Sequence, residues 1–304
     1  MQHKSIIITL SCWLLTYLLT AQSVDRIPSG EVKQLLKKLN ILGSVLYVAA
    51  HPDDENTRLI AYYANEKLFN TSYLSATRGD GGQNLIGPEI RENLGLIRTQ
   101  ELLAARRTDG GTQFFSRAND FGYSKNPSET LSIWDKEKVL EDFIRVIRTI
   151  KPDVIITRFN TVSGITHGHH TTSALLALEA FDLAGDSSVY PDQLRTLEVW
   201  QPKKLFWNTS SWFYSSNKIK FNPEGLYSIN VGTYNPNLGV SYTEMAAQSR
   251  SMHKSQGFGS TGSRGDELEY LELLRGDSTG NDVFGGINTT WERVEQSEKI
   301  SQFF

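Results

Sequence analysis

Cysteine is nearly absent from this sequence, because its 304 residues include only one, Cys12. Cys12 lies in an apolar N-terminal segment that we expect to be removed, so the mature chain would carry no thiol. This absence excludes a disulfide, a thiolate metal site and a cysteine nucleophile from the mature protein. Any bound metal must then be held by imidazole and carboxylate groups. Stability must come from an ordinary hydrophobic core, which a chain of this length can bury.

A charge excess is absent as well. The chain has 31 Lys and Arg against 34 Asp and Glu, and loss of the N-terminal segment would remove Lys4 but no acid. A chain so balanced has no electrostatic footprint for nucleic acid or for anionic lipid, so we expect neither as a partner. Its six Trp and 12 Tyr suit a sugar-stacking surface and ordinary packing equally well.

Long apolar runs are limited to one, at residues 6–19. It follows Lys4 and precedes the small residues Thr20 and Ala21, the pattern of an export signal. The run is too short to span a membrane comfortably, although a retained N-terminal anchor is the alternative. We therefore expect residues 1–22 to be removed on export, leaving a soluble protein without a transmembrane span in the periplasm or outside the cell.

What the sequence does contain is an alternation of strand-like and helix-like segments from residue 44 to about 185. The expected strands are residues 44–50, 71–77, 113–115 and 153–159, and the expected helices are residues 54–67, 92–107, 134–151 and 171–183. This alternation predicts an α/β, Rossmann-like fold with a mostly parallel sheet and helices on both faces. In such folds, ligands bind at the carboxyl edge of the strands.

The pattern changes beyond residue 185. Short strands are expected at residues 205–207 and 226–231, and a helix at residues 243–254. Residues 257–287 are rich in Gly and Ser, which predicts a loop, and residues 290–304 have a helical pattern. We therefore expect one domain at residues 23–256, followed by a loop and terminal helix at residues 257–304. The abrupt apolar end suggests that a further domain follows. No oligomeric state is predicted.

The segment His51-Pro-Asp-Asp54 directly follows the first expected strand. One neutral imidazole and two carboxylates within four residues can bind a divalent metal and still leave one carboxylate free. The alternative is that Asp53 or Asp54 caps the helix that follows, where carboxylates are favoured.

A second cluster, His167-Gly-His-His170, follows the expected strand at residues 153–159 and precedes a helix. The carboxyl ends of parallel strands meet at one edge of a sheet, so we expect this cluster to lie near His51. The cluster holds three of the six histidines in the chain. Three satisfied core histidines at that position are a weaker explanation than metal chemistry.

Together these segments resemble the PIG-L/LmbE-like family of zinc-dependent N-acetylglucosamine deacetylases. The resemblance covers about residues 42–185, and the matching motifs lie at residues 50–55, 77–82, 96–101 and 167–170, with a weaker match at residues 253–256. It implies a hydrolase that removes the acetyl group from an N-acetylated amino sugar or its conjugate. It also implies one catalytic zinc ion, with another divalent metal as the alternative.

Carried over residue by residue, the resemblance implies that His51, Asp54 and His170 bind the metal. Asp53 would be the general base that takes a proton from the attacking water. His167 would stabilise the oxyanion or protonate the leaving amine. The resemblance thus divides the two neighbouring aspartates between a metal ligand and a base.

Two further residues are implied at the substrate site, and one departs from the family pattern. Arg98 would contact the substrate or support its pocket, and His253 would line that pocket. The family commonly has an aspartate where this chain has His169, and that aspartate orients the catalytic histidine. A neutral imidazole cannot replace this charge. Another acid must then support His167, or the chain is a catalytically weak, metal-containing carbohydrate-binding protein of the same fold.

Two other functional readings have less support. The glycines at Gly79, Gly81 and Gly82 invite a dinucleotide-binding interpretation, but the last glycine of that pattern would fall at position 84, which is Asn. Arg-Gly-Asp occurs at residues 78–80, 264–266 and 275–277, as in cell-adhesion ligands, yet the first copy lies within a family motif and the others lie in or beside a Gly-rich stretch.

Overall fold

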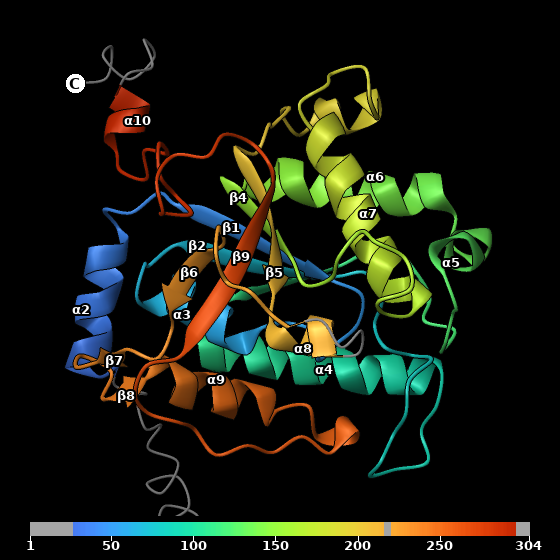
Figure 1. Ribbon diagram of the computed structural model, residues 1–304, viewed down its shortest axis with the longest axis horizontal. Coiled ribbons are helices and arrows are strands. Elements are labelled where there is room, and N and C mark those ends of the chain that lie inside the picture. The colour runs from blue at the N-terminus through green and yellow to red at the C-terminus, as the bar shows by residue number, and fades with distance from the viewer. Residues whose placement is uncertain (1–26, 216–219, 296–304) are drawn as a thin grey trace, which may run out of the picture.

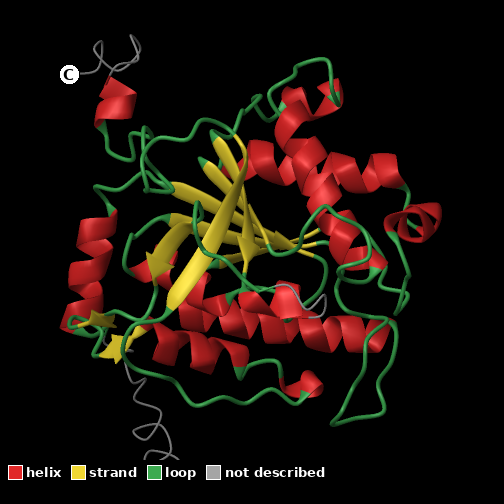
Figure 2. Cartoon of the chain, viewed as in Figure 1, coloured by secondary structure: helices red, strands yellow, loops and turns green. Residues whose placement is uncertain are grey.

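The computed structural model describes residues 27–215 and 220–295. The predicted export signal, with Cys12, lies outside these residues, as does the end of the predicted terminal helix. A seven-stranded sheet forms the centre of the molecule, in the strand order β3-β2-β1-β4-β5-β9-β6 (Figures 1 and 2). Its strands are β1 (Ser44–Ala49), β2 (Asn70–Ser75), β3 (Thr112–Phe115), β4 (Val154–Thr157), β5 (Lys204–Thr209), β6 (Tyr227–Asn230) and β9 (Leu268–Arg275).

Five neighbouring strands of this sheet, from β3 to β5, run parallel. Strand β9 is antiparallel to both of its neighbours, β5 and β6. Two short strands, β7 (Tyr234–Asn235) and β8 (Val240–Ser241), form a separate antiparallel pair. The predicted fold class, a mostly parallel sheet between helices, is confirmed.

Helices cover both faces of the sheet. Helices α3 (Thr57–Asn65), α4 (Glu92–Asp109) and α9 (Tyr242–Arg250) contact one another below the sheet in the view of Figure 1, and α6 (Lys136–Ile150), α7 (Gly168–Leu183) and α5 (Pro127–Ile133) lie on its other side. The remaining helical segments are α2 (Ser29–Lys38), α8 (Ser211–Ser215), α10 (Glu292–Glu295), η1 (Pro191–Arg195) and η2 (Lys254–Gln256).

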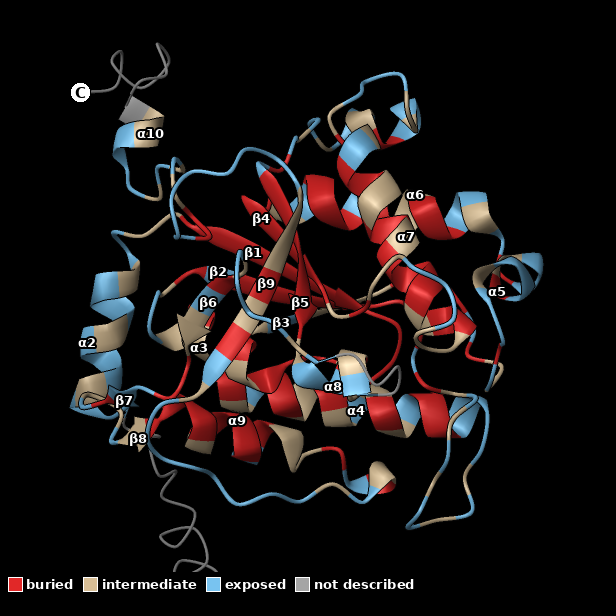
Figure 3. Ribbon diagram, in the orientation of Figure 1, coloured by how far each residue is buried: buried red, intermediate tan, exposed pale blue. Residues whose placement is uncertain are grey.

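The alternating side chains of β1 separate two hydrophobic cores. Val45 and Tyr47 join the core beneath α3, whereas Leu46 and Val48 join the core beneath α6 and α7. All six β1 residues are buried, so the strand needs apolar side chains on both faces, as parallel strands do. Figure 3 shows the central strands buried between the helices. Each fully buried aliphatic side chain contributes about 1.5–3 kcal/mol by leaving water.

One stretch was mispredicted from the sequence, and three α-helices were missed. The predicted loop at residues 257–287 contains β9, which pairs with β5 and β6 in the central sheet. The sheet therefore uses chain from both sides of the predicted boundary at residue 256. The predicted helix at residues 243–254 is divided into α9 and the short η2. Helices α2, α5 and α8 were not predicted at all.

The order of the strands in the sheet determines where the candidate site lies. Strand β1 lies between β2 and β4, so the chain leaves the carboxyl ends of β1 and β4 towards opposite sides of the sheet. Such a topological switch point opens a crevice in α/β folds, and ligands bind there. The segments that follow β1 and β4 carry the two predicted histidine motifs. Among the described residues, no helix is both long and apolar enough to cross a membrane.

Candidate metal centre and catalytic cavity

A cavity of about 500 Å³ opens at this switch point. All but one of the sequence-predicted site residues line it, namely His51, Asp53, Asp54, Arg98, His167 and His170. Segments that are far apart in the sequence therefore meet in one hollow: the turn after β1, the first turn of α7 and the middle of α4.

A tight turn fixes the first motif. The His51 backbone N–H donates a hydrogen bond to Asp54 Oδ2 (2.7 Å), and the same oxygen lies 3.1 Å from His51 Nδ1. The Tyr73 hydroxyl donates to the His51 carbonyl (2.5 Å) from the neighbouring strand β2. The sequence left open whether Asp53 or Asp54 caps the helix that follows. Neither does, because Asn56 caps α3 through its side-chain oxygen.

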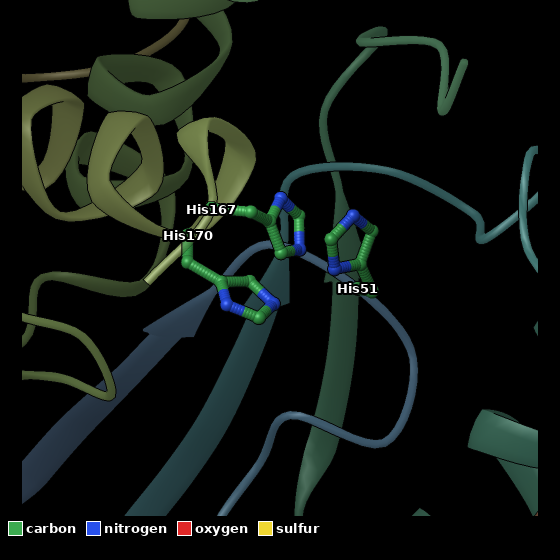
Figure 4. A group of neighbouring side chains, drawn as sticks. All are labelled: His51, His167 and His170. Carbon is green, nitrogen blue, oxygen red and sulfur yellow. The ribbon is translucent and has the colours of Figure 1, made fainter. Parts of the chain in front are cut away.

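The second motif meets the first across the crevice. His170 Nε2 lies 3.4 Å from Asp54 Oδ1, and the His170 ring stacks on Phe159 (3.8 Å between centroids). His167 stands at the start of α7, with its ring centroid 3.7 Å from that of His170 and 5.3 Å from that of His51. Figure 4 shows the three rings facing one another. A ring nitrogen from each of these histidines lies within 4.8 Å of the others.

These donors suit a divalent cation. Burial lowers the pKa of His167 to about 3, with a further contribution from His170, and burial likewise lowers the pKa of His170. Burial acts to raise the pKa of Asp54, but His170 and His51 outweigh it and hold that pKa well below its usual value. Neutral imidazoles and an ionised carboxylate are the forms that ligate metals, and these shifts favour them at His167, His170 and Asp54. At His51, burial acts to lower the pKa, but the Asp54 carboxylate outweighs it and raises the pKa. The His170 nitrogen that faces Asp54 is Nε2, whereas the buried Nδ1 atoms of His167 and His170 point away from the other rings (Figure 4) and have no hydrogen-bond partner among the described residues.

Asp53 occupies a strained position beside these groups. Its φ of 99° is rare for a residue with a side chain, although Asp tolerates positive φ better than most. Its N–H donates to Glu55 Oε2 (2.9 Å), and its carbonyl accepts from Arg250 Nη1 (3.3 Å), so both sides of the peptide are held. Burial and the neighbouring Asp54 carboxylate raise the pKa of Asp53 to about 7. A carboxylate with that pKa can exchange protons at neutral pH.

His253 does not line the cavity as the resemblance implied. Its side chain is fully buried, and its Nε2 lies 2.8 Å from Glu55 Oε1. Arg106 also contacts Glu55 (3.3 Å) and binds Asp109 (2.6 Å). Burial acts to raise the pKa of Glu55, but His253 and Arg106 outweigh it and lower the pKa to about 2. His253 therefore helps hold the Glu55 carboxylate that supports the Asp53 backbone.

Arg98 lines the cavity and supports its wall. Its Nη2 donates to the Gln83 carbonyl (2.6 Å) in the glycine-rich loop. A Cβ atom at Gly82 would lie 2.3 Å from Arg98 Nη1, and Gly79 combines a φ of 70° with close contact to the same side chain. The glycines are thus explained by the close approach of this loop to Arg98.

Several cavity residues were not predicted. They are Asp120, Tyr123, Gln256 and Phe258, among others. Asp120 follows the carboxyl end of β3, so the rule that placed His51 at this edge could have found it. Gln256 and Phe258 follow α9, whose position relative to the sheet no local pattern reveals.

His169 is not positioned to orient His167 as the family's aspartate does. Its ring is fully buried, and its Nδ1 lies 3.0 Å from His51 Nε2. The ring centroids of His169 and His167 are 5.3 Å apart. His51, His169 and Asp120 form a second group of potential metal-binding side chains, which shares His51 with the first.

Comparison with known protein families supports the resemblance. Residues 46–181 match the PIG-L family, described as GlcNAc-PI de-N-acetylase. The matched residues run from β1 to α7, so they include both histidine motifs and Asp120.

Curated relatives carry related names. A 1D-myo-inositol 2-acetamido-2-deoxy-alpha-D-glucopyranoside deacetylase from Streptomyces scabiei is 28% identical over 54% of this chain and 55% of its own length. A mycothiol S-conjugate amidase from Streptomyces coelicolor is 27% identical over 54% of this chain and 60% of its own length. The chain thus spans less than two thirds of the length of these relatives.

Solved structures share the fold. The N,N'-diacetylchitobiose deacetylase from Pyrococcus horikoshii aligns with a TM-score of 0.51 and 16% identity, over 77% of this chain and 81% of its own. The 4-carboxy-2-hydroxymuconate hydratase from Pseudomonas putida KT2440 aligns with a TM-score of 0.50 and 16% identity, over 79% of this chain and 99% of its own. One of these proteins is named for deacetylation and the other for hydration, so the fold alone does not fix the reaction.

Proposed function

We propose that this chain, whose residues 46–181 match the PIG-L family, is a metal-dependent hydrolase that deacetylates an N-acetylated amino sugar or its conjugate. Relatives named as a deacetylase and an amidase support hydrolysis of an amide. The observation that carries the proposal is the meeting of Asp54 with both His51 and His170, beside Asp53, at the switch point.

In the proposed site, His51, Asp54 and His170 hold one zinc ion. Three nitrogen and oxygen ligands leave a position open, which is the arrangement of catalytic zinc sites. When bound, the ion would polarise the amide carbonyl and lower the pKa of a water molecule. His167 lies close enough to be a fourth metal ligand. The metal content of a His167 variant therefore distinguishes a ligand role from a catalytic one.

The residues around the ion would move the protons. Asp53 takes a proton from the attacking water as its oxygen bonds to the carbonyl carbon. Asp53 then gives that proton to the nitrogen as the carbon–nitrogen bond breaks, which yields acetate and a free amine. Of the two roles implied for His167, its lowered pKa favours hydrogen bonding to the oxyanion by a neutral N–H over proton donation by an imidazolium.

The cavity walls support a sugar-sized substrate. Tyr123 and Phe258 add aromatic side chains, and Arg98 and Gln256 add polar ones, around the 500 Å³ hollow. Such a mixture of apolar and polar groups is common in pockets for small polar ligands. We propose an N-acetylglucosamine-type group there, as in the names of the relatives, without specifying what is attached to it.

The first test is acetate release. Purified protein loaded with zinc is incubated with a panel of N-acetyl amino sugars and glycosides, and acetate is measured. Asp53→Asn should keep its metal and lose about 10²–10⁴-fold in turnover, because it lacks only the base. His167→Ala should also keep its metal and lose turnover.

Three results would contradict parts of this proposal. Loss of metal from Asp53→Asn would make Asp53 a ligand, and full activity in that variant would place water activation elsewhere. Sugar binding by the parent without any acetate release would instead favour a metal-containing carbohydrate-binding protein.

We also propose that residues 1–22 direct export and are then removed. Lys4, the apolar run and the small residues after it support this. Mass spectrometry of the protein from its native host tests the proposal. An exported chain that still begins at Met1 would contradict it.

A further inference from the structure

His51 has a second neighbour on the side away from Asp54. Its Nδ1 faces Asp54 Oδ2 (3.1 Å), while its Nε2 lies 3.0 Å from Nδ1 of His169. Two ring nitrogens at that distance must share one hydrogen, so one donates and the other accepts. Both nitrogens of His51 are therefore engaged, and they are engaged on opposite sides.

The His169 ring is held so that it can present only this nitrogen to His51. It stacks on Trp134 (5.0 Å between centroids, 20° between planes) and meets the edge of Phe121 (4.3 Å, 87°). The Trp134 indole N–H is itself fixed, because it donates to the Asn119 carbonyl (2.7 Å). The other nitrogen of His169, Nε2, is buried without a hydrogen-bond partner among the described residues.

A carboxylate lies beside the shared hydrogen. Asp120 Oδ1 is 3.7 Å from His169 Nδ1, and Asp120 Oδ2 is 3.9 Å from His51 Nε2. These distances are too long for direct hydrogen bonds, so the carboxylate acts on the pair through its charge. Asp120 is kept in place by the Gly122 N–H, which donates to its Oδ1 (2.8 Å).

We propose that His169 and Asp120 are positioning residues for His51. His169 accepts the Nε2–H of His51 and so leaves Nδ1 bare towards Asp54 and His170. Asp120 supplies the negative charge that strengthens this hydrogen bond. Metal-binding histidines commonly give their other N–H to such an acceptor, which fixes the tautomer and the ring orientation. In this chain the acceptor is an imidazole with a carboxylate from another loop beside it.

This inference rests on the proposed metal site, so its test begins with metal affinity. Zinc binding by the parent, measured by competition with a chelator, tests the proposed function. His169→Phe keeps an aromatic ring between Trp134 and Phe121 but removes the acceptor. His169→Asn keeps an acceptor oxygen near the position of Nδ1. Asp120→Asn removes the charge and keeps an oxygen that accepts from the Gly122 N–H. The control is Asp142→Asn, which removes a charge from an ion pair with Arg117.

We expect His169→Phe to weaken zinc binding about 10- to 100-fold, the usual effect of losing such a partner. His169→Asn should recover most of that loss, Asp120→Asn should lose less than His169→Phe, and Asp142→Asn should lose nothing. Unfolding curves of the metal-free variants separate these effects from instability, because a purely packing role would leave the affinity of folded His169→Phe unchanged.

Other outcomes would overturn the inference. Equal zinc affinities in the parent, His169→Phe and His169→Asn would remove His169 from any positioning role while leaving the proposed function intact. Two zinc ions per parent chain, with one lost in His169→Phe, would make His51, His169 and Asp120 a second metal site. A parent that binds no zinc would end both proposals.

Discussion

The two edges of the central sheet each carry a cavity, and the larger one is at the edge opposite the histidines. The carboxyl-edge cavity measures about 500 Å³, whereas the cavity at the amino edge measures about 850 Å³. The larger cavity is lined by charged residues as well, including Asp153, Lys151 and Lys204. Cavity volume and the charge of the lining residues alone would therefore predict a functional site at the edge that lacks the histidines.

The charged groups of the two edges differ in how they are satisfied. At the amino edge, Asp153 accepts from Arg293 Nη1 (3.0 Å) and from the Ser44 N–H (3.0 Å), and Lys204 Nζ donates to the carbonyl of Gly285 (2.8 Å). At the carboxyl edge, by contrast, buried nitrogens of His167 and His170 have no partner among the described residues.

This difference distinguishes polar groups that stabilise the fold from polar groups that could serve a function. Buried polar groups are normally hydrogen-bonded, so several unpaired ones at one edge set that edge apart from a region whose polar groups only stabilise the fold. Backbone strain at Asp53 lies at the same edge, and such strain persists at functional sites where the surroundings enforce it. The positive φ of Lys151 at the amino edge is instead the left-handed conformation that ends α6. Four experiments can test this distinction.

The largest effect is expected from removing the proposed ligands. His51→Ala and His170→Ala should each weaken zinc binding at least about 100-fold, because losing a ligand should cost no less than losing one of its hydrogen-bond partners. Metal analysis after dialysis against a weak chelator measures this. Full occupancy in both variants would remove the metal from this edge.

A second effect concerns the stability of the metal-free protein. The pKa of Asp53 is raised from 3.8 to about 7, so between these pH values the folded protein holds a proton that the unfolded chain releases. Its contribution to the free energy of unfolding therefore falls as the pH rises through this window. Asn cannot ionise, so metal-free Asp53→Asn should gain stability over the parent as the pH rises.

The expected gain is about 1–2 kcal/mol at pH 8 and close to zero at pH 4, after allowing for solvent screening of a partly exposed group. Urea unfolding of chelator-treated protein at both pH values measures it. A gap of equal size at the two pH values would contradict a raised pKa. A parent that is more stable than the variant at pH 8 would contradict it as well.

At the amino edge, a comparable substitution should do much less. Asp153→Asn keeps an oxygen for the Ser44 N–H but removes the charge opposite Arg293. Burial raises the pKa of Asp153 despite Arg293, so losing this charge should change the free energy of unfolding by no more than about 1 kcal/mol. Zinc affinity and turnover should match the parent, and a loss of either would make the amino edge functional.

Much of this site could be predicted from the sequence because its motifs are local. His51 follows a continuous apolar strand, and the cluster from His167 to His170 follows another, so the parallel sheet was enough to bring them together. The parallel order of β1 and β4 is itself encoded in the alternation of strands and helices.

Residues outside these motifs could not be placed in the same way. His253 follows α9, and its contact with Glu55 spans almost two hundred positions in sequence. The role of Asp120 depends on which way the His169 ring turns, and that is decided by Trp134 and Phe121 on separate elements. Strand β9 was hidden because its short apolar pattern lies between Gly- and Ser-rich stretches that resemble loops.

The smallest effect is expected at the rim of the amino-edge cavity. Lys151 Nζ lies 2.5 Å from Glu198 Oε2, and both side chains are exposed. Lys151→Met keeps most of the aliphatic chain and removes the ion pair, which at an exposed site contributes less than about 1 kcal/mol. Urea unfolding should shift by no more than about 0.5 kcal/mol, and less at high salt, because salt screens exposed charges. Zinc affinity should be unchanged. A larger, salt-independent loss would mean that this edge depends on specific charge pairing as the carboxyl edge does, and the contrast between the two edges would then be wrong.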